Sequence, residues 1–288
     1  MPFDPLRGAI ILASLFMATT LRFWKMNGAG NDFVMLDNRD LSLSLSTEQI
    51  ARLCDRHRGV GADGLLLVEP AQSDGDFRMR YYNADGGEAE MCGNGARCYG
   101  RFVNFLHEDK LSNIKFETMA GIISAEFEGD QVRINMSAPH TLKLAQELDV
   151  AGGKLTVHSV NTGVPHAVVF VDDLENVDVI KLGAGLRYHE AFKPKGTNAN
   201  FAKVLGPNSI QIRTYERGVE GETLACGTGM VASALIHHEL TGAASPVAVL
   251  VKGGDTLRIG FDEPSPHDYT NVTLFGPADF AFSGEVSL

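Results

Sequence analysis

Cysteine is scarce in this sequence, and its spacing excludes the common cysteine-based scaffolds. The 288 residues contain four cysteines, Cys54, Cys92, Cys98 and Cys226. Four is too few for a disulfide-stapled secreted domain of this length. No two of them form a CxxC pair and none lies at zinc-finger spacing from a histidine, so we expect no metal site. The default setting for such thiols is the reducing cytoplasm.

Basic residues and long apolar runs are also in short supply. Lysine and arginine number 25 against 36 acidic residues, and the net charge of -11 argues against nucleic acid as a partner. The apolar run at residues 8–20 is too short to span a bilayer, so no membrane partner is expected. It resembles either a short export signal or an overextended start before Met17. We favour the second interpretation and treat residues 1–20 as an uncertain N-terminal extension.

What the chain does contain is an internal repeat. Cys92-Gly93-Asn94-Gly95 matches Cys226-Gly227-Thr228-Gly229 at an offset of 134 positions. Three further pairs of segments follow in the same order at offsets of 133 to 135: FVMLDN with VVFVDD, GADGLLLV with GTNANFAKV, and RMRYYNADG with IQIRTYERG. Four ordered matches at a nearly constant offset predict two related halves that meet near residues 135–141.

Each half predicts the same elements. Residues 77–82 and 209–215 alternate apolar and polar as half-buried strands do, and each leads through a Gly-rich loop into the Cys-Gly-x-Gly segment. A helical period follows in each half, and Gly242 is expected to end the second helix. Residues 114–136 and 247–261 have the pattern of a meander and a hairpin.

We therefore predict an α+β fold of two pseudo-symmetric domains, each a mostly antiparallel sheet wrapped around a central helix. The active site is expected in the cleft between them. The N-terminal domain comprises residues 21–138 and is joined by residues 277–288, and the C-terminal domain comprises residues 139–276.

Cys92 and Cys226 each precede Gly-x-Gly at a predicted helix start. Backbone N–H groups there carry partial positive charge, so we expect a lowered thiol pKa and a place for a carboxylate. One such thiol could be an acyl-transfer nucleophile. Two thiols facing one ligand suit a cofactor-free racemase or epimerase, in which one removes an α-proton and the other returns it. Cys54 and Cys98 lie on apolar helical faces and are interpreted as packing residues.

Several long motifs resemble those of the diaminopimelate epimerase family. They are KMNGAGNDFVMLDN, RHRGVGADGLLLVE, YYNADGGEAEMCGNGARC, TGVPH, YERGVEGETLACGTGMVAS and VKGGDTLRI. The resemblance runs from about residue 22 to the C-terminus. It implies an isomerase that interconverts LL- and meso-diaminopimelate without pyridoxal phosphate or any other cofactor, in lysine and peptidoglycan-precursor synthesis.

The resemblance also implies roles for particular residues. Cys226 accepts and Cys92 donates the proton in the LL to meso direction, and the roles reverse in the other direction. His166 and Glu216 are expected to tune the thiol pKa values. The expected substrate-binding residues are Asn31, Asn83, Gly93, Asn94, Asn198, Glu216, Arg217, Gly227 and Thr228. The family is usually dimeric, Phe282 falls near a dimer contact, and a homodimer is therefore expected.

Two positions depart from the family pattern, and two other functions stay open. Gly64 stands where glutamine is frequent and Val164 where asparagine is frequent, so each loses a side-chain contact to the ligand. A related two-cysteine isomerase, such as a proline or hydroxyproline racemase, is the alternative enzyme. A redox-sensing or binding protein with a disulfide between Cys92 and Cys226 is the alternative from another class.

Overall fold

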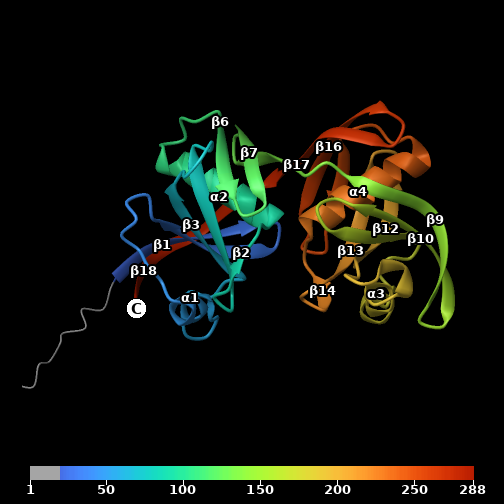
Figure 1. The fold of residues 1–288 in the computed structure, drawn as a ribbon, viewed down its shortest axis with the longest axis horizontal. Helices are drawn as coiled ribbons and strands as arrows, with labels where there is room; N and C mark the ends of the chain where they lie inside the picture. The colour runs from blue at the N-terminus through green and yellow to red at the C-terminus, as the bar shows by residue number, and fades with distance from the viewer. Residues whose placement is uncertain (1–19) are drawn as a thin grey trace, which may run out of the picture.

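The computed structural model describes residues 20–288, which form two bodies lying side by side (Figure 1). The interpretation of residues 1–20 falls almost wholly outside this range. The first half contains β1 (Thr20–Gly28), β2 (Asn31–Asp37), α1 (Thr47–Cys54), β3 (Gly64–Pro70), β4 (Phe77–Asn83), β5 (Glu88–Ala89), α2 (Gly93–Leu106), β6 (Asn113–Thr118), β7 (Gly121–Glu128), β8 (Gln131–Asn135) and β9 (His140–Val150). The second half contains β10 (Gly153–Asn161), β11 (Pro165–Phe170), α3 (Val179–Arg187), the short 3-10 helix η1 (Glu190–Phe192), β12 (Asn198–Gly206), β13 (Ser209–Glu216), β14 (Gly221–Thr223), α4 (Gly227–Thr241), β15 (Val247–Leu250), β16 (Thr256–Ser265), β17 (Asp268–Pro277) and β18 (Asp279–Ser287).

Strand pairing follows the same order in both halves. β1–β2 is antiparallel, β2–β3 parallel, β3–β4 antiparallel and β4–β6 parallel, and β6, β7 and β8 continue as an antiparallel meander. β10–β11, β11–β12, β12–β13 and β13–β15 repeat these directions, with β15 and β16 beginning the second meander. The predicted duplication and the α+β class are confirmed.

A central helix lies inside each sheet. α2 contacts β1, β2, β3, β7 and β8, and α4 contacts β10 to β13 together with β15, β16 and β17. Residues 230–236 of α4 are all fully buried, as expected for a helix that is apolar on every side. α4 ends at Gly242, whose φ of 73° provides the left-handed stop that the sequence predicted. The smaller helices α1 and α3 lie at one end of their bodies (Figure 1).

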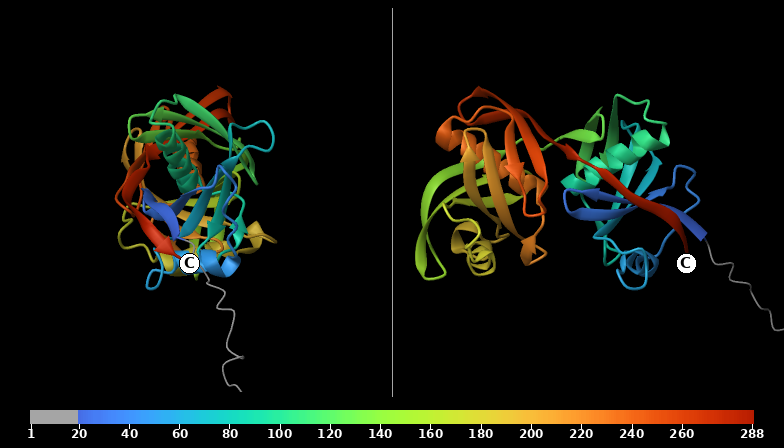
Figure 2. Two further views of the ribbon diagram at one scale, coloured as in Figure 1. Left: turned by 90° about the vertical axis from the view of Figure 1, so that its left-hand side faces the viewer. Right: turned by 180° about the vertical axis from the view of Figure 1, so that it is seen from behind.

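The last strand of each half pairs with the first strand of the other half. β9 is antiparallel to β10, and β18 is antiparallel to β1 along almost its whole length. Figure 2 shows β18, in red, running from the second body into the first. β8 and β17 pair directly between the bodies, so the eighteen described strands form one hydrogen-bonded network. Both bodies are therefore held to each other by main-chain hydrogen bonds as well as by side chains.

The largest hydrophobic cluster continues from one body into the other. It includes Phe102 and Cys98 of α2, Leu235 of α4, and Leu274 of β17. Cys98 is fully buried there, while Cys54 is buried in a smaller cluster beneath α1, so both predicted packing roles are confirmed. This shared core fixes the two central helices relative to each other.

Candidate active site

The N-termini of the two central helices meet at the junction of the bodies. Cys92 and Cys226 are the N-cap residues of α2 and α4, with nearly identical extended backbones (φ -133° and -132°) and no side-chain cap bond. A Cβ added to Gly93 would lie 3.8 Å from the Cα of Gly227, and 3.5 Å from a methyl of Leu274. The two first turns therefore lie next to each other, and the structure brings the two predicted cysteines to one place.

Burial raises the pKa of both thiols, contrary to the expectation of a lowered value. Cys226 is 6% exposed and Cys92 is half-buried. Removal from water raises both pKa values most, and the carboxylate of Glu216 raises them further. N–H groups of Asn94 and Gly95 act in the opposite direction on Cys92. The helix N-termini are present as predicted, but desolvation outweighs their effect on the thiol pKa values.

Glu216 ends β13 and influences both cysteines. Burial raises the pKa of its own carboxyl, and the nearby Thr223 side chain lowers it. A carboxylate beside two thiols disfavours both thiolates, whereas a neutral carboxyl group removes that repulsion. Glu216 is therefore positioned to couple its own protonation to that of Cys92 and Cys226.

His166 is buried behind Cys226 and is connected to it through Thr228. Its Nε2 lies 2.9 Å from Thr228 Oγ1, which lies 3.7 Å from Cys226 Sγ. Burial lowers the pKa of His166 to about 3, with a further contribution from the charge of Arg217. The imidazole is consequently neutral at physiological pH, which excludes a resting imidazolium beside the thiol.

Asn31 and Asn94 form a bonded pair on the Cys92 side. Asn94 Nδ2 donates to Asn31 Oδ1 at 2.7 Å, and Asn31 Nδ2 donates to Asp63 Oδ2 at 2.9 Å. Because a carboxylate only accepts, Asp63 fixes the orientation of the Asn31 amide. Asn94 is 2% exposed, and its Oδ1 has no hydrogen-bond partner within residues 20–288. That acceptor suits the N–H of a ligand such as an ammonium.

Asn198 and Arg217 form the corresponding group in the second body. Asn198 Oδ1 accepts the backbone N–H of Arg217 at 2.7 Å, and its Nδ2 donates to the carbonyl of Pro165 at 3.3 Å. The side chain of Asn198 thus connects the residue before His166 to the residue after Glu216. The Arg217 guanidinium contacts the carbonyl of Lys195 at 3.3 Å and leaves most of its donors without a protein partner within the described chain.

Tyr81 belongs to the site, although the sequence analysis did not select it. Its hydroxyl donates to Asn83 Oδ1 at 2.9 Å. Burial raises the pKa of Tyr81 well above its usual value, and the charges of Cys92, Asp63 and Glu216 raise it further. The only sequence signal was its place two residues before Asn83 on the same strand face.

The same tyrosine explains the glycine at position 64. A Cβ on Gly64 would lie 2.7 Å from the Tyr81 ring and 2.6 Å from the carbonyl oxygen of Tyr82. The aromatic ring therefore fills the space in which a longer residue at position 64 would begin.

Sheet register relates the site residues of the two halves. Phe33 pairs with Gly64 in the first body, and His166 pairs with Asn198 in the second. Asn31 and Val164 each lie two residues earlier, at matching places. Asn31 of the first half therefore corresponds to Val164 of the second, and Gly64 of the first half corresponds to Asn198 of the second. One residue of each corresponding pair is an asparagine. The site has two-fold geometry but different chemistry on its two sides.

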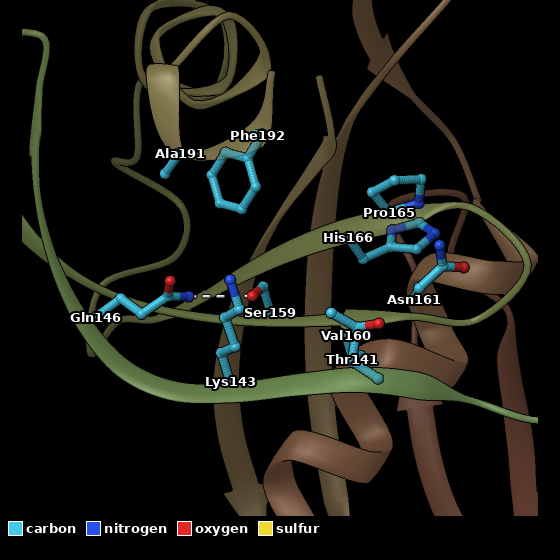
Figure 3. A pocket seen from close by; sticks show the side chains of 10 residues that line it. All are labelled: Thr141, Lys143, Gln146, Ser159, Val160, Asn161, Pro165, His166, Ala191 and Phe192. Atoms are coloured by element: carbon cyan, nitrogen blue, oxygen red, sulfur yellow. Dashed lines mark hydrogen bonds between the residues drawn. The ribbon is translucent and has the colours of Figure 1, made fainter. Parts of the chain in front are cut away.

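A separate cavity borders His166 in the second body (Figure 3). Its lining residues are Thr141, Lys143, Gln146, Ser159, Val160, Asn161, Pro165, His166, Ala191 and Phe192. Gln146 Nε2 donates to Ser159 Oγ at 3.0 Å across this cavity. Neither active-site cysteine lines it, so the cavity is a neighbour of the thiol site and not the site itself.

Two classes of site find no support in the described chain. Residues 20–288 contain no group of three or more His, Cys, Asp or Glu side chains arranged to hold a metal ion. None of the helices described is both long enough and apolar enough to cross a bilayer. All four cysteines are free thiols.

Solved structures share this two-body fold. A phenazine biosynthesis protein of the PhzF family from Bacillus anthracis superposes with a TM-score of 0.68 at 16% identity, covering 94% of this chain and 100% of that chain. A probable proline racemase from Agrobacterium radiobacter gives 0.66 at 16% identity, with 93% of each chain covered. The fold is therefore the architecture shared with these PhzF-family and proline racemase-like structures.

Sequence comparison places the chain within one family of that fold. The family model for diaminopimelate epimerase matches residues 23–142 and 158–270. A diaminopimelate epimerase from Aquifex aeolicus is 44% identical over 282 residues, which cover 93% of this chain and 98% of that protein. Another from Archaeoglobus fulgidus is 42% identical over 93% of this chain and 97% of that protein. The chain belongs to the diaminopimelate epimerase family, and its members are isomerases.

Proposed function

We propose that this protein interconverts LL- and meso-diaminopimelate by direct proton transfer at the α-carbon, without a cofactor. The observation that carries the proposal is the meeting of two cysteine N-caps from two related domains. Curated relatives named diaminopimelate epimerase, at 41% to 44% identity over nearly their whole lengths, support this substrate over that of a proline-racemase-like enzyme. In this role the protein acts in the synthesis of lysine and of peptidoglycan precursors.

The first turns of α2 and α4 would hold the reacting carboxylate. Gly93 and Gly227 are neighbours, so N–H groups from both helices could bind one carboxylate. As the α-proton leaves, negative charge spreads onto the carboxylate. Each N–H that strengthens its bond at that moment is worth about 10² to 10³ in rate.

The two thiols would exchange one proton across the substrate. In the LL to meso direction Cys226 takes the α-proton as a thiolate, and the Cys92 thiol returns a proton to the opposite face. After turnover Cys226 is a thiol and Cys92 a thiolate, the reverse of the starting state. A proton on Glu216 removes its repulsion of either thiolate, which is how this residue tunes both cysteines.

Polar groups on both sides of the cysteines would recognise the rest of the substrate. The Arg217 guanidinium suits the distant carboxylate, because its planar donors match two oxygens. Asn83, Asn198 and the unpartnered oxygen of Asn94 suit the remaining ammonium and carboxylate atoms. A substrate with two charged ends satisfies more of these groups than proline does.

The proposal is tested with stereochemically pure LL-diaminopimelate under reducing conditions. We expect meso product without added cofactor, α-proton exchange in D2O, and loss of at least a hundredfold of activity in Cys92→Ala and in Cys226→Ala. Cys98→Ala is the matched control, because this cysteine lies on the same helix as Cys92 but is buried in the core. Wild-type turnover in either active-site variant, or faster turnover of proline, would contradict the proposal.

We further propose that the enzyme is a cytoplasmic homodimer. Phe282 on β18 is 53% exposed and packs edge-on against Phe23, which leaves one aromatic face for a second copy. Four free thiols suit a reducing compartment. Light scattering of wild type and Phe282→Asp tests the dimer, and a monomeric wild type would overturn it. Cell fractionation tests the location.

A further inference from the structure

We propose that Asn200 is a positioning residue that fixes the tautomer of His166, so that a chain of hydrogen-bond donors ends at the Cys226 sulfur. The chain runs from Asn200 through His166 and Thr228 to Cys226. Its kinetic consequence rests on the proposed function, whereas its hydrogen-bond polarity is a property of the protein alone.

The orientation of the Asn200 amide is determined by its neighbours. Asn200 is fully buried on β12, and its Nδ2 lies 3.0 Å from the carbonyl oxygen of Ala167. Its Oδ1 accepts the hydroxyl of Thr214 at 3.0 Å. A carbonyl oxygen only accepts, so exchanging the amide oxygen and nitrogen would place two acceptors together. The nitrogen must therefore face Ala167, and its second N–H faces His166.

This amide dictates which nitrogen of His166 carries the proton. Asn200 Nδ2 lies 3.1 Å from His166 Nδ1, so Nδ1 accepts and has no proton of its own. A neutral imidazole then carries its proton on Nε2, which donates to Thr228 Oγ1 at 2.9 Å. Thr228 Oγ1 thus accepts the proton of His166. The Thr228 hydroxyl then donates its own single proton to Cys226 Sγ, which lies 3.7 Å away.

A doubly protonated His166 would not fit this arrangement. A proton on Nδ1 would face the N–H of Asn200, placing two donors together in a site with His166 only 1% exposed. Burial and the positive charge of Arg217 both lower the pKa of His166, so they also disfavour the imidazolium. His166 therefore acts as a fixed donor that stabilises the Cys226 thiolate, and it does not act as the base that removes the thiol proton.

Within residues 20–288, Cys92 has no such chain. By sheet register the residue that matches His166 is Phe33, which has no donor. Asn94 matches Thr228, because each is the second residue of its helix. The Asn94 side chain donates to Asn31 instead. The donor chain thus acts on one of the two thiols, which makes the other an internal control.

The first experiment determines the tautomer directly. In histidine labelled with nitrogen-15, ring-nitrogen chemical shifts identify which nitrogen is protonated, and His166→Gln assigns the signal. We expect the Nε2–H form from pH 5.5 to 8.5 with no titration. A proton on Nδ1, or a His166 that titrates in this range, would overturn the proposal whether or not the enzyme is an epimerase.

The second experiment measures thiol reactivity residue by residue. Iodoacetamide labelling at fixed pH, read by mass spectrometry of separate peptides, reports the thiolate fractions of Cys226 and Cys92. Loss of a donor to a charged sulfur should raise the Cys226 pKa by about one unit, which slows its labelling about tenfold. We expect this in Asn200→Leu and Thr228→Val, with Cys92 changed less than about twofold.

Two further variants separate polarity from packing. Thr214→Val removes a hydrogen bond from the same buried amide but leaves its N–H toward His166, so Cys226 labelling should stay near wild type. Thr228→Ser keeps the hydroxyl and should also label like wild type, which keeps the test available if Asn200→Leu does not fold. Equal slowing in Thr214→Val and Asn200→Leu, or wild-type labelling in Thr228→Val, would refute the chain. A wild-type protein without epimerase activity would instead refute the proposed function.

Discussion

Alanine substitution at two equivalent helix positions should have opposite effects on stability. Gly95 and Gly229 are both the third residue of their central helices. A Cβ on Gly229 would lie 2.4 Å from Asn200 Oδ1, about 1 Å closer than an ordinary contact. A Cβ on Gly95 would meet the Phe33 ring at 3.4 Å, which is such a contact. The expected difference follows from whether the neighbour can move.

Asn200 cannot move without losing its hydrogen bonds. Three bonds hold its side chain, to Ala167, His166 and Thr214, and at about 0.5 to 1.5 kcal/mol each their loss costs about 1.5 to 4.5 kcal/mol. Alanine in place of a helical glycine returns about 0.5 to 1 kcal/mol. Gly229→Ala should therefore lower the free energy of unfolding by about 0.5 to 4 kcal/mol. Gly95→Ala should leave it unchanged or raise it by up to about 1 kcal/mol.

Urea denaturation followed by tryptophan fluorescence and by circular dichroism measures both variants under one protocol. Coincident transitions by the two probes establish that a single free energy describes unfolding. In addition, Gly229→Ala should slow iodoacetamide labelling of Cys226, because it displaces the amide that orients His166. Equal destabilisation of the two variants, or a stabilised Gly229→Ala, would refute the argument that a close packed amide requires glycine at this position.

Three other outcomes are expected. Glu216→Gln should speed iodoacetamide labelling of both active-site thiols at fixed pH, because the carboxylate raises their pKa values; unchanged rates would contradict this. Burial raises the pKa of Asp32, but hydrogen bonds, the first from Arg56, bring it down to about 2, so Asp32 stabilises the fold above its unfolded pKa. That contribution, about 2 kcal/mol, should disappear between pH 4 and 2 in wild type and be absent in Asp32→Asn by urea denaturation. Tyr81→Phe should raise KM several-fold without moving the urea midpoint, since it removes only the hydroxyl that contacts Asn83; an unmoved KM would exclude Tyr81 from the site.

The sequence was sufficient for the features that depend on local pattern. Alternation located β4 and β13, the Gly-x-Gly repeat located the starts of α2 and α4, and Gly242 marked the end of the second helix. Exchange of β9 and β18 between the bodies is a pairing across the whole chain, which no local period encodes. The direction of the thiol pKa shifts also required the structure, because it depends on how completely each sulfur is buried.

Asn200 and Tyr81 illustrate why part of the site stayed hidden. Asn200 lies in TNANF, where it reads as one polar residue at a strand start, and only its three partners on β11 and β13 show its role. Tyr81 reads as a strand aromatic, and only the contact with Gly64 shows where its ring lies. In both cases the function comes from a neighbour that is distant in sequence.

The difference between the two sides of the site follows from the reaction, although the fold is nearly symmetric. The two faces of an α-carbon need one thiolate and one thiol at the same moment, so identical surroundings would give neither cysteine a preference. On the Cys226 side the matched positions hold His166 and Thr228, and on the Cys92 side they hold Phe33 and Asn94. The backbone geometry of the two N-caps is nearly the same. The duplication therefore supplies the matched positions, and the two N-caps differ in the side chains around them. In the proposed mechanism, a donor chain that stabilises the Cys226 thiolate alone favours removal of the α-proton from the LL substrate.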